Sequence, residues 1–136
     1  MKDYTVVRRV IEKLISDNYT GNLKLIFENT FLEATNVEHI TIIDEGDTYV
    51  ESMELGGNIS RNAGMIVLGI FTALGEGTNK ARSVANALDI IFDKEVPGIS
   101  FGEREFRVIG ADESSPLYQH SFIVPYQHFY GQEDST

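Results

Sequence analysis

Histidine and carboxylate side chains are the groups in this 136-residue sequence whose types could serve catalysis or metal binding. The histidines are His39, His120 and His128. His120 and His128 share one face of a strand by parity, but eight residues of extended chain hold them about 27 Å apart. That distance is too long for one metal ion, so each histidine is better explained as a satisfied structural or surface side chain.

The carboxylates gather in one polar segment, where five acidic residues lie between positions 44 and 54 without the spacing of an EF-hand. The sequence has no cysteine, which excludes thiol catalysis, disulfides and cysteine-ligated metals. Ser114-Ser115-Pro116 is typical of a turn and not of a nucleophile elbow. We therefore expect no catalytic residue, no metal and no cofactor, and we predict that the protein is not an enzyme.

A glycine-rich segment, GEGTNK at residues 75–80, precedes an amphipathic pattern. It lacks the GxxxxGK[ST] spacing of a phosphate-binding loop. The better interpretation is a strand-to-helix turn made by Gly75 and Gly77, with Thr78 as the N-cap of the helix.

The formal charge of −10 disfavours direct binding to nucleic acid, although an acidic wall would let DNA pass without adhering. Arg8, Arg9 and Lys13 are better explained as a solvated helix face. The first 15 residues lack the apolar core of a signal peptide. The longest apolar run, residues 65–71, is too short to cross a bilayer, so we expect a soluble protein.

Hydrophobic periodicity indicates the elements that must position these residues. A helix is predicted after Asp3 as far as Asn18, and a second one from Thr78. Strands are predicted at 23–28, 37–43, 63–72, 103–109 and 120–130. The order α-β-β-β-α-β-β predicts an α+β fold: a mostly antiparallel sheet of about five strands with two helices packed on one face. We expect one domain over residues 1–130 and a polar tail at 131–136.

The acidic segment 44–62 is predicted to be either a long loop or an extended hairpin, with Gly56-Gly57 at a turn or tip. It carries four sizeable apolar residues, which we predict to be interaction residues, with ordinary loop packing as the alternative: Tyr49, Val50, Met53 and Leu55. Arg61 and Arg82 are predicted to meet carboxylates of a neighbouring chain.

Two of the predicted strands are apolar on both faces. In the third strand Met65, Val67 and Phe71 point one way, while residues 66, 68 and 70 point the other. In the last strand Phe122, Val124 and Tyr126 lie on one face, and Ile123 and Phe129 lie on the opposite face. Two helices cover only one face, and each large apolar group left in water forgoes roughly 1.5–3 kcal/mol.

Either the 44–62 segment folds back over the second face, or a neighbouring subunit covers it; we favour the neighbour. Pro125 cannot donate to a ladder, so the last strand is predicted to be an edge strand or to carry a bulge there.

The order and spacing of several motifs resemble those of a known family. These motifs are the N-terminal helix, Phe27-Glu28-Asn29 followed by Phe31, the apolar strand 64–71, the 75–77 turn with its helix, and strand 120–130 with Pro125. Together they are similar to the tail-terminator proteins of long-tailed bacteriophages, the lambda-like tail-terminator and minor tail family, over residues 3–130.

The resemblance implies a virion structural protein of the phage tail, assembled in the host cytoplasm. Such a protein forms a homo-oligomeric ring, usually a hexamer, that caps the tail tube, stops its polymerisation and presents the surface for the head–tail neck protein. Its partners are copies of itself, the tail-tube protein and the neck protein, with DNA passing through the lumen and no cofactor. The alternatives are a tail-tube or head–tail connector subunit, or a small-ligand-binding domain.

Overall fold

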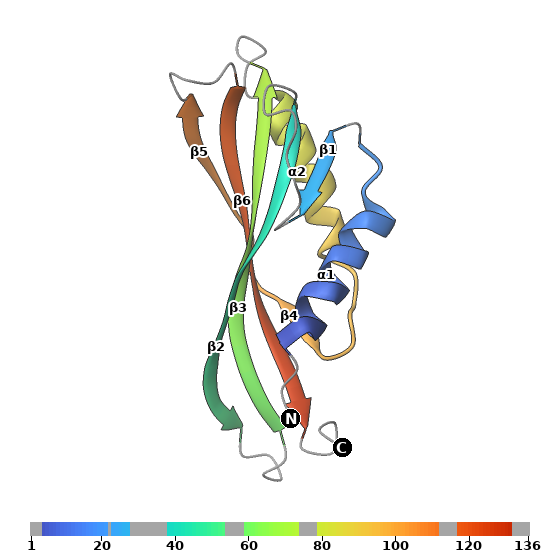
Figure 1. Ribbon diagram of the computed structural model, residues 1–136, viewed down its shortest axis with the longest axis vertical. Coiled ribbons are helices and arrows are strands. Elements are labelled where there is room, and N and C mark those ends of the chain that lie inside the picture. Colours follow the sequence, from blue (N-terminus) through green and yellow to red (C-terminus); the bar gives the residue numbers. More distant parts are fainter. Residues whose placement is uncertain are drawn as a thin grey trace.

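The computed structural model describes residues 4–21, 23–27, 38–53, 59–73, 79–111 and 117–131. Side chains are described for 7–21, 23–27, 38–45, 62–73, 79–111 and 117–129. Figure 1 shows two helices on one side of a long, twisted sheet. The elements are α1 (Tyr4–Asn18), β1 (Lys24–Phe27), β2 (His39–Met53), β3 (Ile59–Ala73), α2 (Asn79–Ile91), β4 (Ile99–Phe101), β5 (Glu105–Ala111) and β6 (Leu117–Gly131).

The six strands form one sheet in the order β1-β2-β3-β6-β4, with β5 also pairing with β6. Only β1 is parallel to its neighbour, and the other pairs are antiparallel. The predicted α+β fold is therefore confirmed. Its sheet has one strand more than the five expected, because the short β4 was not predicted.

Segment 44–62 contributes strands to the sheet. β2 continues to Met53, and β3 begins at Ile59, so the segment extends the β2–β3 hairpin. Register shifts between Asp44 and Asp47 and between Val50 and Met53 let β2 bend while it stays paired with β3. The alternative in which this segment folds back over the sheet is wrong, and the extended hairpin is confirmed.

The hydrophobic core lies between the helices and one face of the sheet. Helical spacing brings buried side chains of α1 and α2 to the same layer, and alternate residues of β2, β3 and β6 meet them. This cluster includes Val7, Ile11 and Ile15 from α1, Leu88 and Ile91 from α2, Phe92 directly after α2, Ile40 and Ile42 from β2, Ile66, Leu68 and Ile70 from β3, and Phe122, Val124 and Tyr126 from β6. The parity predicted for β3 and β6 is confirmed.

Pro125 lies in the interior of the sheet and not at its edge. β6 has β3 on one side and β4 and β5 on the other, so the prediction of an edge strand was wrong. The Gly102 amide donates to the Pro125 carbonyl at 2.7 Å, which places the Pro125 nitrogen on the same side of β6. The missing N–H thus faces residues 102–104, where β4 ends and β5 has not begun. The irregularity that proline requires lies in the neighbouring strand.

Several predicted features lie outside the described residues. These are the Asp3 and Thr78 caps, the 75–77 turn, Leu55, the Gly56-Gly57 tip and residues 132–136 of the predicted tail.

Candidate functional site

The face of the sheet turned away from α1 and α2 is here called the open face. Cross-strand pairing places Ile43 beside Val67 and Met65 beside Pro125, with Ile123 next to Val67 on the other side. All five point away from the core layer by parity. No described helix covers them, because α1 and α2 lie together on the opposite side (Figure 1).

Exposure distinguishes the two faces of the same strands. On β3, Ile66 and Leu68 are fully buried on the core face, whereas Met65 on the open face is 41% exposed. On β2, Ile42 is buried, whereas Ile43 is 43% exposed. Neighbouring residues of one strand thus differ only in the face they occupy. The open face is an apolar surface that the described part of the chain leaves in contact with water.

One end of the open face is organised around an aromatic pair. His39 and Phe71 are cross-strand partners, and their rings stack with centroids 4.5 Å apart and an interplanar angle of 13°. Gly69 lies beside this pair, and a Cβ there would come within 2.6 Å of the Thr41 Oγ1 and 2.9 Å of the Phe71 ring. Glycine is therefore needed for the close approach of these two side chains.

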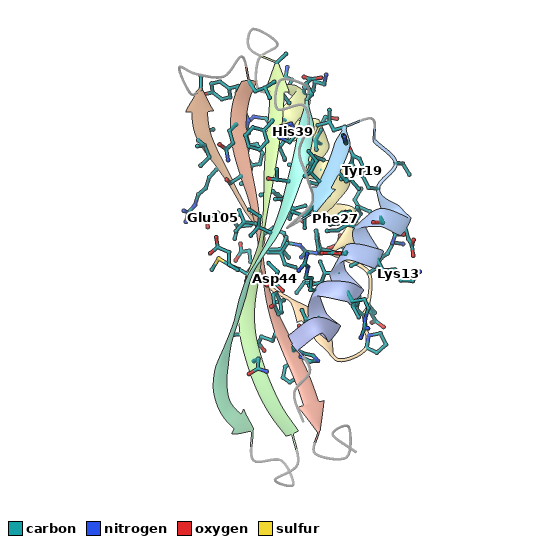
Figure 2. All side chains as sticks on the ribbon, in the orientation of Figure 1. Lys13, Tyr19, Phe27, His39, Asp44 and Glu105 are labelled. Atoms are coloured by element: carbon teal, nitrogen blue, oxygen red, sulfur yellow. The ribbon has the colours of Figure 1, made fainter. Side chains whose placement is uncertain are left out.

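The border of the open face on β5 is charged. Arg107 donates to both carboxylate oxygens of Glu105, at 2.8 and 3.1 Å, and these hydrogen bonds lower the pKa of Glu105. Figure 2 shows Glu105 on the side of the sheet opposite to α1, where Lys13 is labelled. A polar border around an apolar centre is the usual arrangement of a protein–protein interface.

A groove of about 620 Å³ lies on the other side of the sheet, between α2 and the β4–β5 segment. We call it the α2–β5 groove. Ala85, Phe106 and Phe122 form its apolar lining, and the charged lining residues are Arg82, Asp89, Glu103 and Arg104. The Arg82 guanidinium lies 5.5 Å from the centroid of the Phe106 ring. Arg104 pairs with Asp89 at 3.2 Å and with Asp93 at 2.9 Å.

His120 is a buried imidazole next to Phe106, one of the residues that line this groove. It stacks on Phe106 with centroids 5.1 Å apart, and Tyr118 lies at the same distance. As predicted, His120 is a structural side chain, since it is fully buried, but among the described residues neither of its ring nitrogens has a hydrogen-bond partner. Burial, and then the positive charge of Arg82, lower the pKa of His120.

The predicted interaction residues fall into two groups. Tyr49, Val50 and Met53 lie in the distal half of β2, where Val50 pairs with Arg61 of β3. Their side chains, and the whole of Leu55, lie outside what the structure describes. Arg82 is on α2, in the groove. The structure thus brings four of the six together on one hairpin and separates Arg82 from them.

The apolar residues of the open face were singled out by parity but not as interaction residues. Met65, Val67 and Ile123 were recognised as the second face of two-faced strands. What the sequence did not provide was the strand order, which decides that Ile43 joins them.

No protein-family model matches this sequence, and no curated protein is significantly similar to it. One solved structure, which carries only a serial designation and states no function, resembles this fold with a TM-score of 0.66. The match covers 94% of this chain and 96% of that one, at 17% sequence identity. At such low identity the likeness shows a shared fold alone.

Among the described helices, none is long and apolar enough to cross a membrane. Within the described ranges, no three histidine, aspartate or glutamate side chains are grouped as metal ligands.

Proposed function

We propose that this chain is the subunit of a homo-oligomeric ring, and that the ring is a tail terminator of a long-tailed phage. The observation that supports assembly is the open face, where Ile43 and Met65 are 43% and 41% exposed beside partly buried Val67 and Ile123. Such a surface is typical of a protein whose second layer comes from another molecule.

The energetics favour a neighbouring chain as the cover. Complete burial of one large apolar side chain contributes roughly 1.5–3 kcal/mol, so four partly exposed ones offer several kcal/mol to an interface. Part of this gain offsets the translational and rotational freedom lost on association. A net favourable free energy of association requires the apolar side chains to form one contiguous patch. Ile43, Val67 and Ile123 meet this requirement, because they are consecutive neighbours across three strands.

The terminator role rests on the sequence resemblance, and the fold is compatible with it. In this proposal the ring caps the tail tube and offers a second surface to the neck protein, without a cofactor. The proposed partners are other copies of the chain, the tail-tube protein and the neck protein, and the proposed location is the phage tail.

Two alternatives differ in what they predict for the purified protein. A tail-tube subunit would stack into tubes, whereas a terminator would stop at one ring. A small-ligand-binding domain would remain a monomer and use a pocket with convergent polar groups. The α2–β5 groove fits that alternative poorly, since Arg104 is engaged by Asp89 and Asp93.

The test is the oligomeric state of the wild type and of two matched variants. Light scattering and electron microscopy of the wild type should give rings. Met65→Lys places a charge on the open face and should abolish them. Ile90→Lys introduces the same charge at an exposed position of α2 and should leave them intact. A wild-type monomer, or equal loss of rings in both variants, would contradict the proposal.

A further inference from the structure

β2 carries a bulge near the middle of the sheet. Asp44 pairs with Ile66. The next paired residue of β2, Asp47, pairs with Gly64, so two residues of β2 lie opposite the single residue Met65 of β3. Figure 2 places Asp44 near the middle of the long sheet. Because a bulge disrupts the ladder and bends the strand, this is the point at which β2 can most easily change direction.

The part of β2 beyond the bulge, residues 47–53, is here called the distal part of β2. In Figure 1 the lower ends of β2, β3 and β6 continue beyond α1. The described residues of β1 pair with β2 only as far as Ile42, so β1 does not support the distal part. The direction of the distal part therefore depends on its pairing with β3 and on the geometry of the bulge.

One side-chain hydrogen bond crosses the sheet at the bulge. The Tyr126 hydroxyl of β6 donates to the Asp44 Oδ1 at 3.1 Å. β3 lies between β2 and β6, so this hydrogen bond joins the two strands that flank β3. Gly64 pairs directly with Tyr126 and has no side chain to obstruct the tyrosine on its way to β2. Tyr126 is 2% exposed and belongs to the core, so its ring is a firmly packed anchor for the hydroxyl.

The same stretch of backbone carries three residues of the open face. Ile43 precedes Asp44, Pro125 precedes Tyr126, and Met65 is the residue opposite the bulge. Because side chains alternate along a strand, these three point away from the hydrogen bond and toward the open face. A change in the geometry of the bulge would therefore move Met65 relative to Ile43.

We propose that the hydrogen bond from Tyr126 to Asp44 is a latch, which holds the bulge of β2 in one geometry and thereby keeps the open face ready to bind another copy. The role in assembly rests on the proposed function, whereas the latch itself does not. Asp44 is half-buried, so water can solvate its carboxylate when the hydroxyl is absent. Loss of the latch therefore loosens the bulge locally and leaves the core packed.

Amide hydrogen exchange tests the latch independently of the oligomeric state. Tyr126→Phe removes the hydroxyl and keeps the aromatic ring in the core. The amides of residues 47–50 should exchange about tenfold faster in this variant, because a hydrogen bond to a carboxylate no longer opposes local opening. The amides of residues 40–42, on the other side of the bulge, should change by less than about twofold, because they belong to the part of β2 that stays packed.

Tyr118→Phe is the matched control. It removes the hydroxyl of another tyrosine of β6, near the opposite end of the strand, where the ring lies beside His120. It should leave the exchange of residues 47–50 unchanged. The latch would be overturned by unchanged exchange in Tyr126→Phe, by equal acceleration in both variants, or by equal acceleration on the two sides of the bulge.

Light scattering over a range of protein concentrations tests the role of the latch in assembly. Tyr126→Phe should raise the concentration for half-assembly by about tenfold, because its open face must be ordered again on binding. Tyr118→Phe should leave this concentration unchanged. Faster exchange without a change in assembly would overturn the role of the latch in assembly. A wild type that stays monomeric would contradict the proposed ring, and the exchange experiment would still decide whether the latch exists.

Discussion

At the scale of single residues, two positions on the sheet, Gly69 and His120, are defined by the side chains that pack against them. Gly69 is required because Thr41 and Phe71 close over its Cα. His120 is buried beside the rings of Phe106 and Tyr118, and no described residue forms a hydrogen bond to either of its nitrogens. Sequence reasoning could assign His120 to a strand, but it could not foresee that β5 would place Phe106 against its ring.

Gly69→Ala should destabilise the fold by about 1–3 kcal/mol, because the added methyl overlaps the Thr41 Oγ1 and the Phe71 ring. Urea denaturation followed by circular dichroism measures the change. Thr41→Ala in the same chain removes one of the two clashing groups and should recover part of the loss. An unchanged unfolding midpoint in Gly69→Ala would contradict the close approach.

His120 should make stability fall as the solution is acidified. Its folded-state pKa is lowered, so below about pH 6.5 the unfolded chain binds the proton more readily than the folded one. The stability that neutral His120 allows is therefore fully present above the pKa of the unfolded chain, and it is lost as the pH falls through the pKa of the folded chain.

The His120→Phe variant should lack this contribution. The difference in unfolding free energy between it and the wild type, measured by denaturation from pH 7.5 to 5, should therefore change in favour of the variant as the pH falls. A pH-independent difference would show that His120 is not the group responsible.

At the scale of elements, one ion pair joins three segments at the end of the sheet remote from Met53 and Ile59. Glu38, just before β2, accepts a hydrogen bond from Lys80 in the first turn of α2. It also accepts one from the backbone amide of Ala73, the last residue of β3, at 2.8 Å. These contacts lower the pKa of Glu38, with the Lys80 hydrogen bond as the largest cause.

Glu38→Gln should reduce the unfolding free energy by about 1 kcal/mol at pH 7, a modest value because Lys80 is partly exposed. The wild-type carboxylate stabilises the fold above its unfolded pKa, and this stabilisation is lost as the pH falls through the lowered folded pKa. The two proteins should therefore converge in denaturation experiments near pH 3. A difference that persists there would contradict the role of the charge.

The sequence predicted the existence of the strands better than their lengths. β2 was expected to end at Ile43 because the residues that follow are acidic and include Gly46. They nevertheless remain in the sheet, since β3 supplies a continuous partner and register shifts absorb the irregular residues. The prediction of an edge strand from Pro125 was wrong for a related reason. The missing N–H of Pro125 faces the interval between β4 and β5, and the local sequence around Pro125 does not reveal this interval.

At the scale of the whole molecule, the sheet is longer than two helices can cover, and its second face is apolar near the centre. Parity predicted this face from β3 and β6 alone. Segment 44–62 could be recognised only as a segment of unusual composition, and the α2–β5 groove could not be predicted because it is assembled from α2 and β5, which are separate in the sequence. Their meeting depends on tertiary packing.

Salt should strengthen assembly. A hexamer would carry six times the −10 of one chain, and counter-ions screen this repulsion while apolar burial is unaffected or reinforced. Light scattering at low and high ionic strength should show a higher ringed fraction in salt. A ringed fraction that falls with salt would mean that attraction between unlike charges governs the assembly.

The pairing of β3 with β6 continues without a register shift from Ile59 and Gly131 at one end of the sheet to Ala73 and Leu117 at the other. The hydrogen bonds of this ladder lie across the strands. A pull along the distal end of β3 against the opposite end of β6 therefore loads many of them in shear at once, so that they must break together and not one after another. We expect the sheet to resist extension along its strands more strongly than separation of its strands from one end.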